Sequence, residues 1–209
     1  MKRAITIIFF GLSSLVSLSQ NIDLEGLKQR LQSTTNDTLR LVQLDSLAIG
    51  YSESYVDSSI LYAEMQLKLS NALGFKINEA AALNMKAYAL LNMGNYPASL
   101  QTFLKGIEIA ADPVSEKKII PEKYRSTLGF KSNDHSPHTY RLQVLSFLYF
   151  NLGILYENAG NNEKALFNYF EALHIGETTS NKQIIGSTSM NIGRVYLFTK
   201  KKRLSFTVS

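Results

Sequence analysis

Residues 151–156 read Asn-Leu-Gly-Ile-Leu-Tyr, and residues 191–196 read Asn-Ile-Gly-Arg-Val-Tyr. Both stretches follow one pattern of Asn, an apolar residue, Gly and Tyr, and Gly153 and Gly193 lie forty residues apart. A pattern that returns at a fixed spacing of this size is typical of an array of small repeated units. We therefore expect repeats of about 40 residues, not one globular domain.

A second alignment places one interruption in the array. Residues 93–100 match residues 159–166, with Gly94 and Gly160 separated by 66 residues, which is one 40-residue unit plus 26. Residues 112–137 account for the difference, because they hold three of the four prolines in a polar mixture without sustained periodicity. Prolines disfavour helix in the residues before them, so we interpret this segment as an insertion.

The clearest unit predicts a helical hairpin. Helices are expected over residues 140–159 and 163–175, with the polar turn 160–162 between them. Apolar residues recur every three or four positions in the second helix, which indicates one buried stripe. Small residues at Gly153 and Ala165 allow the two helices to approach closely. Because such a hairpin cannot bury its apolar face alone, we expect each one to stack on its neighbours.

At these positions the sequence resembles the tetratricopeptide repeat family. The resemblance implies an all-α fold of hairpins stacked in a right-handed superhelix of about three and a half units. Units 1 and 2 would occupy residues 38–111, and unit 3 with the first helix of unit 4 residues 138–199. The residues that carry the resemblance, expected to be structural, are Tyr149, Leu152, Gly153, Tyr156, Gly160, Ala165, Tyr169, Ala172, Gly193 and Tyr196.

The earlier units depart from the family pattern. In the second unit Phe103 agrees with it, but four other signature positions hold different residues, namely Ala87, Leu90, Ser99 and Gly106. The first unit keeps mainly Ser59 and its apolar spacing.

The N-terminus has the three-part layout of a secretory signal peptide. Two basic residues precede the uncharged run 4–18, and small residues at Ser17 and Ser19 would allow cleavage before Gln20. The run of 15 residues is shorter than the roughly 20 that span a bilayer. We expect residues 1–19 to be removed on export to the periplasm and 20–37 to form a lead; an uncleaved anchor or a buried helix is the alternative.

The charge balance argues against nucleic-acid binding. The chain has 22 Lys and Arg against 17 Asp and Glu, but six of the basic residues are Lys2, Arg3 and residues 200–203. The remainder is 16 basic against 17 acidic, which leaves no excess of positive charge to bind phosphates. The basic tail 200–209 does not continue the repeat pattern, so we expect a truncated version of a longer protein, with a natural short end as the alternative.

No pattern of catalytic residues is present. The sequence lacks phosphate-binding glycine loops, nucleophile elbows and HExxH motifs, and it has no cysteine. His135 and His138 stand near Asp134 in the insertion, but neither rigid spacing nor a fourth ligand supports a metal site. We expect a solvated loop there, and a protein that is not an enzyme and uses no metal or cofactor. A hydrolase or metal protein that uses the insertion is the minor alternative.

The resemblance implies a binding role, because first helices of this family line a groove that selects a protein or peptide. The groove residues it implies are Asn84, Tyr88, Asn92, Phe150, Ile154, Glu157, Asn158 and Arg194; Phe150 is equally interpretable as core. The whole layout also resembles the extracytoplasmic repeat region of envelope sensor proteins, including histidine kinases. We therefore expect the sensory or scaffold part of a longer signalling protein, which would meet the membrane only through a downstream segment; a free-standing periplasmic scaffold is the alternative.

Overall fold

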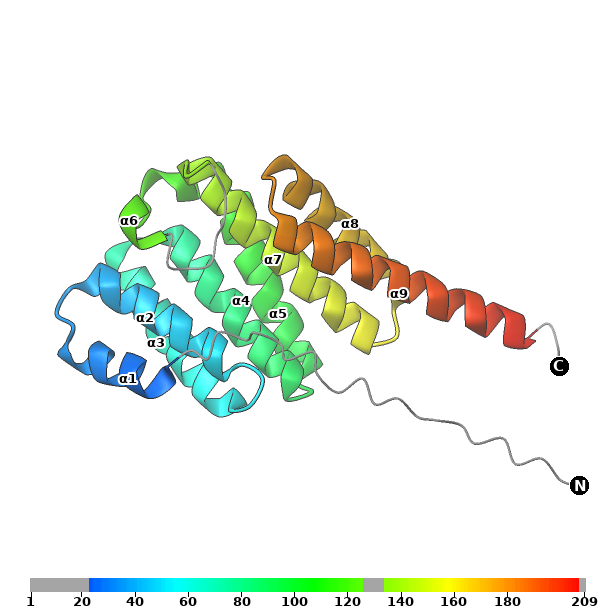
Figure 1. Cartoon of the computed structure of the whole chain (residues 1–209), viewed down its shortest axis with the longest axis horizontal. Coiled ribbons are helices and arrows are strands. Elements are labelled where there is room, and N and C mark those ends of the chain that lie inside the picture. Colours follow the sequence, from blue (N-terminus) through cyan, green and yellow to red (C-terminus); the bar gives the residue numbers. More distant parts are fainter. Residues whose placement is uncertain (1–22, 126–133, 207–209) are drawn as a thin grey trace, which may run out of the picture.

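The computed structural model describes residues 23–125 and 134–206, with side chains described over 23–124 and 134–199. This part of the chain is all-α, with nine α-helices and one short 3-10 helix (Figure 1). The expected signal peptide, residues 1–19, lies outside the described residues. The helices are α1 (Leu24–Ser33), α2 (Asp37–Tyr51), α3 (Val56–Leu73), α4 (Lys76–Asn92), α5 (Tyr96–Ala111), η1 (Pro113–Lys117), α6 (Glu122–Arg125), α7 (Pro137–Asn158), α8 (Asn162–Thr178) and α9 (Lys182–Phe206).

Consecutive helices pack as antiparallel hairpins. α2 pairs with α3, α4 with α5 and α7 with α8, and α9 packs on α8 as the start of a fourth unit (Figure 1). α1 packs on α2 ahead of the first hairpin. The expected all-α fold of stacked hairpins is confirmed.

Glycine and asparagine define the turns within the second and third hairpins. Gly94 and Gly160 each have a φ of 76°, a left-handed conformation that a β-carbon disfavours and that ends α4 and α7. The next residues, Asn95 and Asn161, are the N-caps of α5 and α8: each side-chain oxygen accepts a hydrogen bond from the backbone N–H three residues on. The same two-residue signal therefore produces the same turn in both units.

Small residues allow the two helices of each hairpin to approach closely. A β-carbon added at Gly153 would lie 2.5 Å from the ring of Tyr169 on the opposite helix. In the second unit the Ser99 hydroxyl donates a hydrogen bond of 2.7 Å to the carbonyl of Ala87, and Ser59 makes the equivalent bond in the first unit. Serine thus takes the place of the alanine that the resemblance implies without leaving a buried hydroxyl unsatisfied, which explains how units with weaker signatures keep the same packing.

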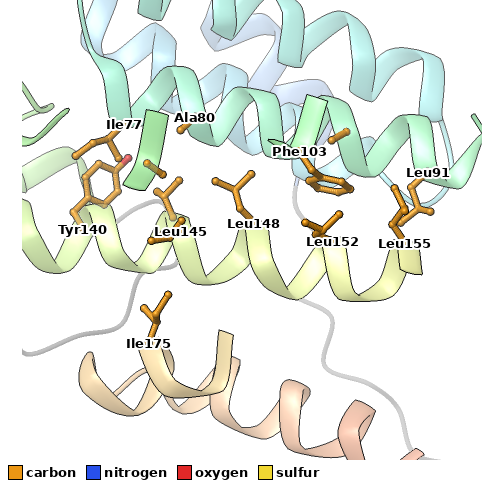
Figure 2. Packing of buried hydrophobic residues seen from close by; sticks show 13 residues of the cluster. Ile77, Ala80, Leu91, Phe103, Tyr140, Leu145, Leu148, Leu152, Leu155 and Ile175 are labelled. Atoms are coloured by element: carbon orange, nitrogen blue, oxygen red, sulfur yellow. The ribbon is translucent and has the colours of Figure 1, made fainter. Parts of the chain in front are cut away.

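The main core lies where α7 meets the second hairpin (Figure 2). Leu148 and Leu152 of α7 point toward α4 and α5, where Phe103 is fully buried. A β-carbon at Gly106 of α5 would lie 2.7 Å from Leu148, so this contact also depends on a small residue. Ile175 of α8 approaches α7 from the other side (Figure 2). α7 is thus covered by helices of two hairpins.

The solvated loop was expected around His135 and His138, and another part of the insertion is buried. Ile120 is fully buried beside Leu41 and Phe75 of the first unit, and α6 packs on α2. His135 and His138, whose region suggested the loop, are exposed. Residues 113–125 therefore reach back across the second hairpin to the first.

Arg141 fixes the insertion to α7. Its side chain is 6% exposed, and Nε donates a hydrogen bond of 2.7 Å to Glu116, while Nη1 donates one of 2.8 Å to the carbonyl of Ala110 at the end of α5. The Arg141 bond, assisted by His138, holds the pKa of Glu116 below its ordinary value. One guanidinium group therefore joins α5, η1 and α7.

Asp45 is a buried carboxyl group in the first hairpin. Gln66 of α3 donates a hydrogen bond of 3.0 Å to it. Burial raises the pKa of Asp45 from 3.8 to about 6, because the single bond from Gln66 only partly replaces the lost solvation. The folded state therefore favours the protonated form of Asp45.

This shift predicts that the first hairpin loses stability as pH rises. The Asp45 contribution is fully present below about pH 4 and is lost as pH passes about 6, a difference of about 3 kcal/mol. We expect the effect of Asp45→Asn on the free energy of unfolding to be more favourable at pH 7.5 than at pH 4.5 by about 2 kcal/mol. The reason is that the substitution removes a carboxyl group that is charged in the folded protein at pH 7.5 and mostly neutral at pH 4.5. Urea denaturation of the wild type and the variant at both pH values measures the free energies of unfolding.

The matched control is Glu108→Gln, which neutralises an exposed carboxylate on α5. We expect its effect to differ between the two pH values by less than about 0.5 kcal/mol. An Asp45→Asn effect that is the same at pH 4.5 and 7.5 would contradict the assignment of a raised pKa.

Candidate functional site: the inner face of the helix array

First helices of successive hairpins lie against one another. α2 contacts α4, α4 contacts α7 and α7 contacts α9, whereas within the described ranges none of the second helices α3, α5 and α8 contacts another. The array therefore curves with its first helices on the inside. We call the open side of these helices the inner face; its residues on α4, α7 and α9 are Tyr88, Asn92, Ile154, Asn158, Arg194 and Phe198.

A side-chain amide pair joins α4 to α7. Asn151 Nδ2 donates a hydrogen bond of 3.0 Å to Asn84 Oδ1, and Asn84 is 8% exposed. Asn84, expected from sequence in the groove, therefore lies between the two helices instead of on their open side. Its amide fixes the spacing of the inner face.

Two further residues of the expected groove tie α4 to the first hairpin. Tyr88 donates a hydrogen bond of 2.6 Å to Glu53, and the Asn92 side chain donates one of 3.0 Å to the carbonyl of Ser52. Burial, together with the bond to Glu53, raises the pKa of Tyr88 to about 12, so the phenol stays protonated at neutral pH. Asn92 remains exposed while it makes this bond.

A charged pair joins α7 to α9. Arg194 Nε and Nη2 donate hydrogen bonds of 2.8 Å to the two carboxylate oxygens of Glu157, and Tyr169 of α8 donates one of 2.7 Å. Burial raises the pKa of Glu157, but the bonds from Arg194 and Tyr169 outweigh it and hold the pKa below its ordinary value. Glu157 therefore remains a carboxylate that links three helices.

The other expected groove residues are less constrained. Asn158 is exposed, and Ile154 is half-buried at the junction of α7, α8 and α9. Phe150 is half-buried with its ring centroid 6.0 Å from that of Tyr169, so it contributes to packing as well as to the surface. Among the sequence-expected residues, Asn158 and Ile154 are thus the best placed to touch a ligand.

Sequence reasoning missed two exposed apolar residues on α9. Leu197 is 72% exposed and Phe198 is 63% exposed. The 40-residue spacing could have identified them, because positions 197 and 198 align with Glu157 and Asn158, two expected groove residues of the preceding unit. Apolar side chains replace polar ones where the surface is open.

The residues that carry the resemblance differ in burial between the third unit and α9. In the third unit the signature residues within the hairpin are buried or half-buried, and Gly160 occupies the left-handed turn. On α9, however, Gly193 and Tyr196 are exposed. The buried members are Leu152, Gly153, Ala165, Tyr169 and Ala172, and the half-buried ones are Tyr149 and Tyr156.

The described part of the chain contains no group of three or more His, Cys, Asp or Glu side chains able to hold a metal ion. None of its helices combines the length and apolar character needed to cross a membrane.

Residues 80–113 match the sequence profile of the tetratricopeptide repeat. The matched segment covers most of α4 and all of α5, which is the second hairpin. The chain is thus a helical-repeat protein with a tetratricopeptide repeat at residues 80–113. Repeats of this family generally bind proteins or peptides and are typically non-catalytic. A search among curated proteins found no match to this chain.

Proposed function

We propose that this chain binds a protein or peptide segment along the inner face. The observation that carries the proposal is Phe198, an aromatic side chain 63% exposed and one helical turn beyond Arg194 on that face. Aromatic residues and arginine are enriched at protein interfaces, where a few residues carry most of the binding energy.

The polar bridges support the same proposal, because they hold the inner face in one geometry before a ligand arrives. Asn84–Asn151 fixes α4 against α7, and Glu157–Arg194 fixes α7 against α9. A preformed surface loses little conformational entropy when it binds. The ligand we propose is a segment with an apolar side chain for Phe198 and Ile154, and polar groups for Asn158 and Arg194.

We further propose that the protein acts in the cell envelope after export, as a sensory or scaffold part of a longer signalling protein. The basic start, the apolar run 4–18 and the small residues before Gln20 support export. A free-standing scaffold is the second candidate. Mass spectrometry of the protein purified from the periplasm tests export, because an N-terminus at Gln20 is expected.

The binding proposal is tested with peptides selected from a displayed library against the purified chain. We expect Phe198→Ala to weaken the selected peptides about tenfold, and Asn158→Ala to weaken them less, because the aromatic anchor contributes more contact area. Calorimetry or fluorescence anisotropy measures the affinities. Circular dichroism should show unchanged folding, since both side chains are exposed.

Phe167→Ala is the matched control. Phe167 is 62% exposed on α8, almost the same as Phe198, but α8 is a second helix and does not line the inner face. We expect less than a twofold change in affinity. Equal losses from the two Phe variants would mean that binding does not use the inner face.

A further inference from the structure

The outward side of α8 carries two exposed aromatic residues. Phe167 is 62% exposed and Phe170 is 45% exposed, and the two lie one helical turn apart. The buried residues that pack α8 on α7, among them Tyr169, point to the opposite side of the helix. Neither phenylalanine belongs to a buried apolar cluster of the described chain, in which α8 contacts only α7 and α9. The two rings therefore form an apolar patch on the surface.

The corresponding positions of the earlier second helices are exposed as well. They lie 106 and 66 residues earlier in the sequence and hold Leu61 and Glu64 in α3, and Gln101 and Leu104 in α5. α3 is followed by the complete second hairpin and α5 by the complete third hairpin, and neither hairpin covers these positions. The outward side of a second helix therefore stays open when a complete unit follows it.

Three carboxylates surround the patch on α8. Glu163 lies one turn before Phe167, and Glu171 lies one turn after it. Glu177 lies two turns beyond Phe170. Among the side chains that the structure describes, no Lys, Arg or His forms an ion pair with any of the three glutamates. The patch is therefore both aromatic and negatively charged.

This combination distinguishes α8 from the other second helices. The single lysine of α8, Lys164, lies toward α7, with its Nζ 5.3 Å from the centroid of the Tyr156 ring. The positions of the three glutamates are occupied in α5 by Pro97, Lys105 and Ala111, and in α3 by Asp57, Met65 and Asn71. Exposed phenylalanines between glutamates are thus a feature of α8 and not of the repeat.

We propose that this outward side of α8, which we call the α8 face, binds a basic amphipathic α-helix of a partner protein. The α8 face consists of Glu163, Phe167, Phe170, Glu171, His174 and Glu177. It is separate from the inner face, because the inner face belongs to the first helices α4, α7 and α9. The proposal therefore adds a second binding surface to the one described above.

The charge of the α8 face selects the kind of partner. Its carboxylates attract lysine and arginine side chains, and complementary charges of this kind steer and orient protein association. The same carboxylates repel nucleic acid and anionic lipid surfaces. They also repel the α8 face of a second copy of this chain. A basic protein segment is the occupant that remains.

The shape of the α8 face favours a helical segment. Glu163 and Glu177 are 14 residues apart, which corresponds to about 21 Å along a helix. A partner helix of about four turns matches this length, and side-chain ridges of one helix fit into the grooves of another. Its apolar stripe would cover Phe167 and Phe170, and lysine or arginine on either side of that stripe would approach the glutamates.

The experiment uses the full chain and three labelled peptides of about 18 residues, which span about 27 Å as helices. Each peptide has lysines on both sides of an apolar stripe, and the stripe is made of Leu, Met or Phe. Control peptides have glutamate in place of every lysine. We expect at least one lysine peptide to bind saturably in fluorescence anisotropy, at least tenfold tighter than its glutamate control. Binding should weaken between 0.1 and 1 M salt, because it depends on charge.

Variants of the full chain locate the binding site. Phe167→Ala should reduce affinity for the lysine peptide at least tenfold, because it removes an aromatic side chain from the centre of the contact. Glu177→Lys should reduce the affinity about threefold by reversing one charge of the α8 face. Both residues are exposed, so circular dichroism should show unchanged folding.

Two matched controls should change the affinity less than twofold. Leu104→Ala removes an exposed apolar side chain from the outward side of α5, at the position that corresponds to Phe170. Phe198→Ala removes an aromatic residue of the inner face, and its exposure is almost the same as that of Phe167. A failure of binding at the inner face would leave both expectations unchanged, so the two proposals are tested independently.

Four results would overturn the proposal. The first is that none of the three lysine peptides binds at 0.5 mM. The second is that the glutamate peptides bind as tightly as the lysine peptides. The third is that Phe167→Ala binds like the wild type, or that Phe198→Ala loses as much affinity as Phe167→Ala. The fourth is a dimer in sedimentation that Phe167→Ala dissociates, which would make a second copy of the chain the occupant.

Discussion

Gly153→Ala should lower the free energy of unfolding by about 2 kcal/mol, although alanine is the better helix former. The added methyl group would lie 2.5 Å from the ring of Tyr169. That ring cannot move aside easily, because Tyr169 is fully buried and its hydroxyl donates to Glu157. The helices of the third hairpin must therefore separate slightly. Urea or thermal denaturation measures the loss.

Gly193→Ala is the matched control for this prediction. It makes the same change at the same repeat position, but no described atom lies within 4 Å of the new methyl group. The gain in helix propensity should then raise stability by about 0.5 kcal/mol. Destabilisation of the same size in both variants would show that the close contact between α7 and α8 is not what requires glycine.

Arg141→Ala should also have a large effect and lower the free energy of unfolding by about 3 kcal/mol. The guanidinium group is 6% exposed and satisfies Glu116 and the carbonyl of Ala110. Its removal leaves a partly buried carboxylate and a buried carbonyl without their donor, which costs more than the loss of an exposed pair. Denaturation at pH 7 measures the change.

The pH dependence of Arg141→Ala gives a second readout. Glu116 has a lowered pKa, so its contribution to stability is present above its ordinary pKa and is lost as pH falls through the lowered value. The free energy of unfolding should therefore decrease less between pH 5 and pH 3 in Arg141→Ala than in the wild type. Arg40→Ala removes an exposed arginine paired with Asp37 and should cost less than about 0.5 kcal/mol. Similar losses for the two arginines would contradict the role given to Arg141.

The sequence predicted the hairpins because their signals are local. Gly160 and Asn161 specify a turn within a few residues, and the spacing of Ala165 and Tyr169 specifies one buried face. These features depend on backbone conformation and on helical periodicity, which neighbouring residues determine. The same reasoning served the second unit, where Ser99 has the size of the expected alanine.

The contacts between hairpins could not be predicted in the same way. Asn84 and Asn151 are 67 residues apart, and the repeat pattern does not show which polar residues of successive first helices meet. The position of Asn84 on a first helix suggested a groove residue, but its amide pairs with that of Asn151. The path of the insertion was also missed, because Ile120 packs against residues of the first unit far away in sequence.

That path has a consequence for how the molecule melts. In a linear array each hairpin touches only its neighbours, so either end can fray independently. Here the segment that contains Ile120 packs on the first hairpin, and Arg141 anchors the same segment to the third. Opening the N-terminal end therefore also disturbs the middle of the chain, which makes global unfolding more cooperative. Folding must in turn form the contact between the segment around Ile120 and the first hairpin, which are far apart in sequence.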